Sequence, residues 1–324
     1  MPCGLPHELF MAVDATGALR LESVRRQPRC TVFAVGADID VCRRARPADE
    51  FHLRLAFDVG TERVVTSAAD IVWEHWRDGR RMAALPEPVR PRTRADGYAV
   101  QAALAGRSAH PLFGWKIAAT SVAGQRHINV DGPLAGRLFR ERVFEPGTEV
   151  PFGANSMRVA EAEFAFRMAV DLPPRREAYT VDEVLNAVAT LHPAIEIPDS
   201  RYDDFRLVGA PQLIADNACA HYFVLGPATT ADWRRMDLVE HPVIGTVEDR
   251  ETRTGKGGHV LGDPRIALAW LVNELSGIGV TLRAGEVVTT GTCIVPPPIA
   301  PGDRVRVDFG ALGGVEIQMG TEVG

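Results

Sequence analysis

The sequence has no apolar stretch long enough to cross a membrane. The longest one, from Ile266 to Val272, is far shorter than the ~18 to 20 residues that a membrane helix needs. The N-terminus also lacks the basic segment and apolar segment of a secretory signal, so we expect a cytoplasmic protein. Cysteine is scarce as well: there are five, an odd number, and no two have the spacing of a metal site or a redox pair. We interpret them as reduced thiols.

Lysine is rarer still. Of 36 basic residues only Lys116 and Lys256 are lysines. Because arginine fills the other cationic positions, a lysine indicates either an accident of the surface or a site that needs a compact ammonium group.

The formal net charge of -6 and the lack of a basic block argue against nucleic acid or an anionic membrane as a partner. The glycine-rich segment Thr254 to His259 lacks the spacing of a phosphate loop, and we interpret it as a lid or a surface loop.

The chain divides into two parts by its local patterns. Residues 1–65 show no clear helix and no chemical motif, apart from possible strands at Thr31 to Val35 and Phe51 to Phe57, and we interpret them as an N-terminal appendage. Residues 66–324 form the predicted catalytic domain. With 46% apolar residues, the chain has ample material for a core.

The second part mixes helices and strands without a regular alternation. Four helices are expected: Ser67 to Gly79, Thr93 to Leu104, Thr180 to Leu191 and Pro264 to Leu275. Strands are expected at Gly114 to Thr120, Val159 to Val170, Ile195 to Ile197, His221 to Leu225, Glu286 to Thr290 and Arg304 to Phe309. This order predicts the α+β class, with a mixed or antiparallel sheet.

Two glutamates stand on one predicted strand. In AEAEFAF (160–166) the apolar side chains alternate with Glu161 and Glu163, so both carboxylates point to the same face. Neighbouring carboxylates repel each other, and a hard divalent cation between them relieves the repulsion. The alternative is a strand with an acidic face in solvent.

A third glutamate strengthens the metal hypothesis. Glu196 lies between Ile195 and Ile197, so it faces away from the apolar side of its strand. Three glutamates make an all-oxygen site, which suits Mg²⁺ or Mn²⁺ better than Zn²⁺. His192 precedes a proline, and we expect it in a loop or behind the metal ligands rather than among them.

Further polar residues are candidates for the site. Lys116 alternates with Trp115 and Ile117 and could bind a substrate carboxylate or deliver a proton, unless it is an edge lysine. Asp216 and Asn217 precede an apolar strand, where they could either hold a turn or orient a substrate.

From about Ala68 to Met319, roughly four fifths of the chain, the sequence is similar to a known family, and six segments in order carry the similarity. They are GWKIAATS (114–121), AEAEFAF (160–166), PAIEIPDSR (193–201), IADNA (214–218), VLGDPRIALAWLVNEL (260–275) and VVTTGTCIVPPPIAPGD (287–303). The sequence resembles the 2-keto-4-pentenoate hydratase branch of the fumarylacetoacetate hydrolase superfamily, which also contains the 2-oxo-3-hexenedioate decarboxylases.

The resemblance implies a mixed β-sheet roll with flanking helices. It also implies that Glu161, Glu163 and Glu196 bind Mg²⁺ or Mn²⁺, and that the ion chelates a 2-oxo or 2-hydroxydienoic acid with help from Lys116. We further expect substrate contacts from the polar residues of the matching motifs, namely Asp216, Asn217 and Thr290.

The chain departs from the family at one position. Hydratases commonly read VDQPDFG, with the second aspartate as a proposed acid or base, whereas this chain reads VDGPLAG (130–136). Leu134 replaces the second aspartate and cannot move a proton, so Asp131, which is retained, His127 and His192 are the possible substitutes. Of these we predict Asp131 as the acid or base.

We therefore expect a metal-dependent hydratase that acts on a 2-hydroxydienoic acid in aromatic catabolism. The alternatives are a decarboxylase of the 2-oxo-3-hexenedioate type and a catalytically silent metal-binding subunit. The resemblance also implies a homo-oligomer, or a complex with a decarboxylase or aldolase of the same pathway.

Overall fold

The computed structural model describes residues 9–13, 19–23 and 59–322 of the chain. The chain divides into two compact units, Met1–Thr61 and Glu62–Gly324. In the first unit, strands β1 (Leu9–Val13) and β2 (Leu19–Ser23) pair antiparallel. The strands expected at Thr31 to Val35 and Phe51 to Phe57 lie outside the described residues. Helix α1 (Val59–Arg77) runs across the boundary predicted at residue 65.

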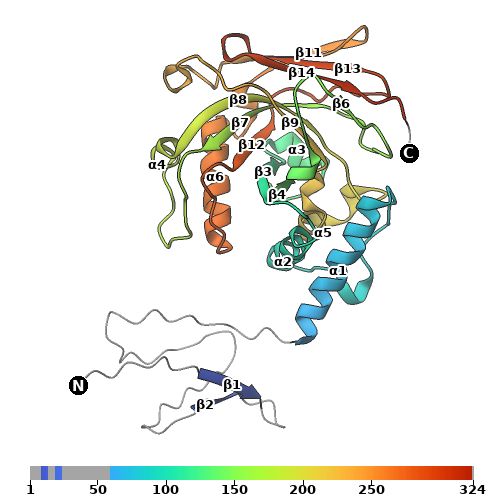
Figure 1. The fold of residues 1–324 in the computed structure, drawn as a ribbon, viewed down its shortest axis with the longest axis vertical. Helices are drawn as coiled ribbons and strands as arrows, with labels where there is room; N and C mark the ends of the chain where they lie inside the picture. The colour runs from blue at the N-terminus through green and yellow to red at the C-terminus, as the bar shows by residue number, and fades with distance from the viewer. Residues whose placement is uncertain (1–8, 14–18, 24–58, 323–324) are drawn as a thin grey trace, which may run out of the picture. The chain divides into compact units, whose positions relative to one another are not determined.

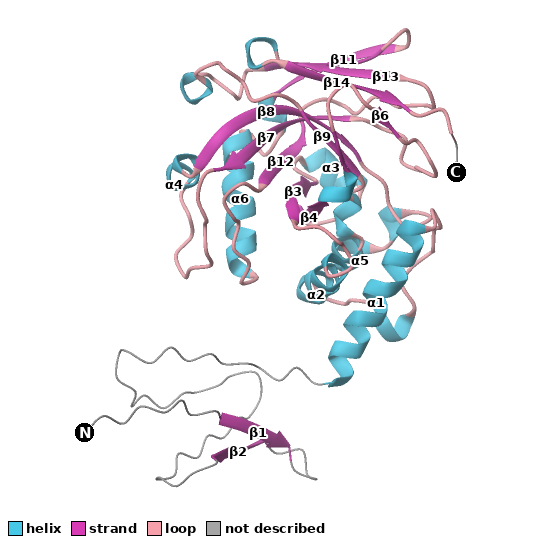
Figure 2. Ribbon diagram, viewed as in Figure 1, coloured by secondary structure: helices cyan, strands magenta, loops and turns pink. Residues whose placement is uncertain are grey.

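A seven-stranded sheet holds the centre of the second unit (Figure 1). Its order is β4 (Leu134–Phe139), β3 (Leu112–Ala118), β12 (Val287–Thr292), β7 (Glu161–Met168), β8 (Val188–Ile197), β9 (Tyr222–Leu225) and β5 (Val143–Phe144). The sheet is mixed, because β12 pairs parallel with β3 and β5 parallel with β9 while the other neighbours are antiparallel. Strands β7 and β8 curve strongly, as Figure 2 shows, so the sheet curls around one of its faces.

A second, five-stranded sheet packs against the outside of this roll. Its order is β11 (Glu251–Lys256), β10 (Pro242–Val247), β13 (Arg304–Asp308), β14 (Gly314–Met319) and β6 (Glu149–Val150). Strand β14 contacts β8 and β9. The main core, which includes Phe164 and Phe166 of β7 and Val243 of β10, fills the space between the sheets. The expected α+β class and mixed sheet roll are confirmed.

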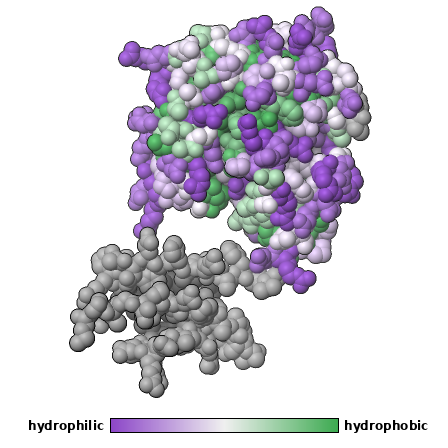
Figure 3. Space-filling model, in the orientation of Figure 1, coloured by the Kyte–Doolittle hydropathy of each residue, from purple (hydrophilic) through white to green (hydrophobic). Residues whose placement is uncertain are grey.

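Helices cover the remaining faces of the roll. They are α1, α2 (Arg94–Ala105), α3 (Val122–His127), α4 (Val181–Asn186), α5 (Gly209–Ala215) and α6 (Pro264–Gly277). The predicted starts of α2 and α6 are confirmed: Thr93 and Asp96 form a capping box, and Asp263 caps α6 with Pro264 in its first turn. Figure 3 shows hydrophilic side chains over much of the visible face, with apolar ones gathered toward its middle. No helix of the described residues is long and apolar enough to span a membrane.

Two predicted boundaries are wrong. Ser67 lies inside α1 and does not cap its start, because the helix extends back to Val59. The helix expected to reach Leu191 ends at Asn186, although its capping box of Thr180 and Glu183 forms as predicted. From Val188 onward, pairing with β7 and burial of alternate side chains favour strand over helix.

His192 therefore lies in strand β8 and not in the expected loop. Pro193, which follows it, cannot donate a backbone hydrogen bond, but β9 ends at Leu225 and the carbonyl of Pro193 accepts from the N–H of Gly226. A proline is tolerated at such an end of strand pairing.

The glycine-rich segment Thr254 to His259 is not a lid or a loop. It continues strand β11 and then forms a short 3₁₀ helix, Gly257–His259. A side chain at Gly255 would place its Cβ 2.0 Å from the carbonyl oxygen of Cys293, so the glycine allows two backbones to pack closely. Lys256 forms a surface ion pair of 2.8 Å with Glu240.

Candidate active site

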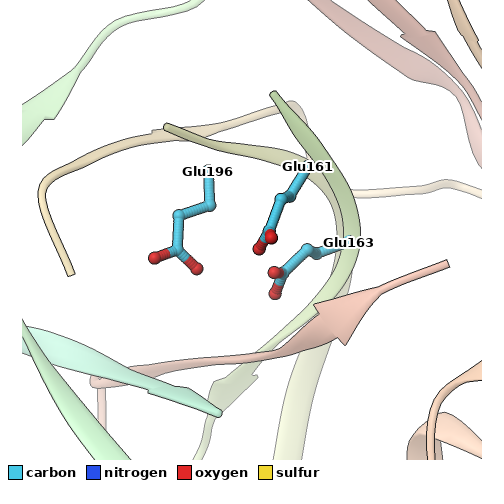
Figure 4. Close-up of side chains that lie close together, drawn as sticks. All are labelled: Glu161, Glu163 and Glu196. Atoms are coloured by element: carbon cyan, nitrogen blue, oxygen red, sulfur yellow. The ribbon is translucent and has the colours of Figure 1, made fainter. Parts of the chain in front are cut away.

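Three glutamates meet on the inner face of the curled sheet. Glu161 and Glu163 alternate with buried core residues along β7, and Glu196 of β8 lies directly across from Glu161 in the strand register. One carboxylate oxygen from each glutamate lies within 4.8 Å of the others (Figure 4). The alternation read from the sequence therefore brings the three carboxylates together, as expected.

The cluster is deeply buried on one side and open on the other. Glu163 and Glu196 are fully buried, whereas Glu161 is partly exposed. Oε1 of Glu163 and Oε2 of Glu196 accept no hydrogen bond from the described residues, and Oε1 of Glu196 is paired with the ammonium group of Lys116. Burial, helped by the neighbouring carboxylates, raises the pKa of Glu163 well above its usual value and that of Glu196 to about 7. Buried acceptors without a donor are costly and fit a bound cation.

Strand β12 supports the other oxygen of Glu163. Its Oε2 accepts hydrogen bonds from the hydroxyl of Thr289 and, at 2.8 Å, from the backbone N–H of Gly291. The hydroxyl of Thr290 instead donates to the carbonyl of Phe164 at 3.1 Å. Of two adjacent threonines on a strand only one can face the site, and the sequence prediction named Thr290 without Thr289.

Lys116 supplies the positive charge of the cluster. Its Nζ lies 2.9 Å from Oε1 of Glu196 and donates a hydrogen bond of 3.0 Å to the carbonyl of Ala218. The side chain is only 3% exposed. Burial alone lowers the pKa of an ammonium group, but the carboxylates of Glu196 and Glu161 outweigh it and raise the pKa of Lys116 above its usual value. Lys116 is therefore an ammonium cation at neutral pH.

The summed charge of the cluster matches the charge of one divalent cation. When ionised, the carboxylates of Glu161, Glu163 and Glu196 carry three negative charges and Lys116 one positive charge, a sum of -2. An all-oxygen donor set with this charge suits a hard ion such as Mg²⁺. The residues present therefore fit a divalent metal.

Asp216 and Asn217 are buried behind the cluster, and their side chains are occupied by protein partners. The carboxylate of Asp216 pairs with Arg201 and accepts a hydrogen bond of 2.7 Å from the hydroxyl of Ser200. The amide of Asn217 bonds both the N–H and the carbonyl of Arg137. The sequence left open whether these two residues hold a turn or orient a substrate. Their contacts in the structure are those of residues that hold a turn.

Asp131 stands apart from the carboxylate cluster. Its side chain is 87% exposed, and the nearby charged group is Arg94 at 3.8 Å. Leu134, which replaces the family's second aspartate, is fully buried in β4 opposite Ala118. Nδ1 of His192 donates a hydrogen bond to the carbonyl of Gly226, its Nε2 shares one with the hydroxyl of Thr190, and the residue is not part of the cluster.

Comparison with known proteins identifies relatives of the same architecture. Residues 107–319 match the family described as "Fumarylacetoacetate (FAA) hydrolase C-terminal". The chain is 31% identical over 254 residues to the 2-keto-4-pentenoate hydratase of Paraburkholderia xenovorans strain LB400, covering 78% of this chain and 93% of that protein. It is also 31% identical over 252 residues to the 2-hydroxyhexa-2,4-dienoate hydratase of Comamonas testosteroni, covering 76% of this chain and 94% of that protein.

A solved structure agrees with this assignment. The 4-oxalocrotonate decarboxylase of Pseudomonas putida G7, complexed with magnesium and adipate, superposes with a TM-score of 0.72 and 26% identity, covering 79% of this chain and 97% of that chain. A second structure of that enzyme is complexed with calcium and acetate. The family match spans well over half of the chain. The chain therefore belongs to the fumarylacetoacetate hydrolase family.

Proposed function

We propose that this protein is a divalent-metal-dependent hydratase, a hydro-lyase of aromatic catabolism. It would add water to a 2-hydroxydienoic acid such as 2-hydroxypenta-2,4-dienoate and release a 4-hydroxy-2-oxo acid. The observation that carries the proposal is the cluster of Glu161, Glu163 and Glu196 beside the ammonium group of Lys116. The names of relatives that are 31% identical over most of both chains support the same substrate class.

Glu161, Glu163 and Glu196 would hold Mg²⁺ or Mn²⁺, because these ions prefer carboxylate oxygens, and the buried Oε1 of Glu163 and Oε2 of Glu196 accept no hydrogen bond from the described residues. When bound, the divalent ion acts as a Lewis acid that stabilises the negative charge developing on the 2-oxygen of the substrate.

The protein's own groups would orient the substrate and hold its proton. An ammonium group has three N–H donors, and Lys116 uses one for Ala218 and directs its charge at Glu196. The remaining donor capacity can bind the substrate carboxylate or deliver a proton to carbon during the exchange of enol and keto forms. The partly exposed side of the cluster, at Glu161, is where substrate would enter. We assign no proton transfer to Asp131, because its side chain is 87% exposed.

The proposal is tested by turnover with Mg²⁺ and 2-hydroxypenta-2,4-dienoate. We expect the dienol absorbance to disappear and the 4-hydroxy-2-oxo acid to appear in the proton NMR spectrum. Glu196→Gln should abolish the reaction, whereas Glu240→Gln, on the surface, serves as the control and should leave it unchanged. Full activity of Glu196→Gln would contradict the assignment of the site.

A second candidate is decarboxylation of a 2-oxo-3-hexenedioate. Leu134 favours it, because loss of CO₂ leaves the same stabilised enolate but does not require a group that activates water. Incubation with this diacid separates the two: CO₂ release from the diacid without hydration of the dienoate would replace the hydratase proposal. Purified protein that binds Mg²⁺ and turns over neither substrate would instead indicate a catalytically silent subunit.

We also propose a cytoplasmic homo-oligomer that can associate with a decarboxylase or aldolase of its pathway. Light scattering of the purified protein, alone and mixed with such an enzyme, measures its oligomeric state and this association.

A further inference from the structure

A buried turn with an unusual backbone lies behind the carboxylate cluster. Asn217, Ala218 and Cys219 have φ angles of 56°, 52° and 61°, so three consecutive residues other than glycine adopt the left-handed conformation. All three are at most 6% exposed. L-residues adopt this conformation only at a steric cost, and such strain persists where the surroundings enforce it.

The side chain of Asn217 is the first element that enforces the turn. Its Oδ1 accepts a hydrogen bond of 2.7 Å from the N–H of Arg137, and its Nδ2 donates one of 2.8 Å to the carbonyl of the same residue. The amide thereby pairs with strand β4 as a neighbouring strand would. Both the oxygen and the nitrogen of the amide are thus engaged by the backbone of β4.

The ion pair of Arg201 and Asp216 is the second element. The guanidinium of Arg201 is 1% exposed and bonds the carboxylate and the carbonyl of Asp216 before the turn. It also donates a hydrogen bond of 3.1 Å to the carbonyl of Ala220 after the turn. Its outer face lies 4.3 Å from the ring centroid of Trp76. One rigid cation therefore clamps both ends of the turn.

The turn delivers one carbonyl group to the active site. The oxygen of Ala218 accepts the hydrogen bond of 3.0 Å from Nζ of Lys116. Gly136 makes this approach possible, because a Cβ there would lie 2.5 Å from the carbonyl oxygen of Asn217 and 3.0 Å from the Lys116 stem. The strained backbone, the glycine opposite it and the lysine form one continuous contact.

We propose that Asn217 and the Arg201–Asp216 pair are positioning residues, which hold the Lys116 ammonium beside the carboxylate cluster through the carbonyl of Ala218. They act on Lys116 and do not touch the substrate. The catalytic effect of this positioning rests on the proposed function, in which Lys116 contacts the substrate. The physical effect, a fixed Lys116 side chain, does not.

The chain offers a direct way to observe this effect. It contains two lysines, Lys116 and Lys256, so labelling lysine with ¹³C at Cε gives two side-chain signals in an NMR spectrum of the full-length protein. Lys256, whose side chain is 41% exposed, is the internal reference, and Lys256→Arg assigns the pair. In the wild-type protein we expect a broad, shifted signal for the fixed Lys116.

Asn217→Gly is the test variant, because glycine tolerates the positive φ while the two amide hydrogen bonds are lost. We expect the Lys116 signal to sharpen and to move toward that of Lys256. In a turnover assay kcat should fall by up to about 10²-fold, the loss that a misplacement of ~1 Å can cause, with a smaller change in KM. Asn217→Asp keeps the acceptor for Arg137, and its line width carries the same test if the glycine variant does not fold.

Asn273→Ala is the matched control. The amide of Asn273 also bonds the N–H and the carbonyl of one residue, Tyr179, at 2.7 and 3.0 Å, but it does so from helix α6. This variant should lower stability and leave the Lys116 signal unchanged. A Lys116 signal in a folded Asn217 variant that matches the wild type overturns the proposal. A wild-type protein without turnover overturns the proposed function alone, because the NMR result does not depend on activity.

Discussion

A divalent cation should stabilise the folded protein by an amount that the carboxylate cluster allows us to estimate. The cluster carries a summed charge of -2 when ionised, and two of its buried oxygens, Oε1 of Glu163 and Oε2 of Glu196, accept no hydrogen bond from the described residues. A ligand that binds only the folded state at 100 times its Kd adds about 2.7 kcal/mol to the free energy of unfolding. At ~2 to 4 °C per kcal/mol for a domain of this size, the Tm should rise by about 5 to 10 °C.

The assay is thermal unfolding of protein stripped with a chelator, with and without Mg²⁺. Glu196→Gln removes one of the carboxylate charges and should abolish most of the Mg²⁺-dependent shift in Tm. Glu240→Gln changes the net charge of the chain equally, but at a surface ion pair, and should retain the full shift. Equal shifts in both variants, or no shift in the wild type, would refute the reasoning, because the ion would then bind elsewhere or not at all.

Three further variants test separate parts of the account. Glu161→Gln should abolish Mg²⁺-dependent turnover while circular dichroism shows an intact fold, since it removes ligand charge and no core packing. Thr289→Val removes a hydrogen bond to the Glu163 carboxylate and should cost ~1 to 3 kcal/mol in urea unfolding and weaken Mn²⁺ binding, whereas Thr290→Val should leave Mn²⁺ affinity unchanged. Burial lowers the pKa of His221 well below its ordinary 6.5, so below pH 6.5 this side chain is protonated in the unfolded chain and neutral in the folded one. The free energy of unfolding should therefore fall as the pH drops below 6.5, and less steeply in His221→Asn. Equal pH profiles for that variant and the wild type would contradict the last prediction.

Local sequence patterns were sufficient to predict features that one strand or one helix turn determines. Strand alternation placed Glu161 and Glu163 on one face and Glu196 on the polar face of its own strand. Capping residues located the starts of α2 and α6, because the hydrogen bonds of a cap are made within four residues. These signals need no knowledge of distant parts of the chain.

Long-range contacts decided what the sequence could not predict. Asp216 pairs with Arg201, 15 residues away, and Asn217 with Arg137, 80 residues away, and no local pattern predicts either partner. Pairing with β7 likewise converts the residues after Asn186 from predicted helix to strand. The departure at Leu134 was visible in the sequence, but the exposure of Asp131 was not, because it depends on the path of the loop between α3 and β4.

The most direct test of the metal site is anomalous diffraction from crystals of the full-length protein soaked in Mn²⁺. The account predicts a strong anomalous peak in contact with the carboxylates of Glu161, Glu163 and Glu196, next to Lys116. Crystals of the wild-type protein that take up Mn²⁺ at other positions, with no peak among these three carboxylates, would contradict it.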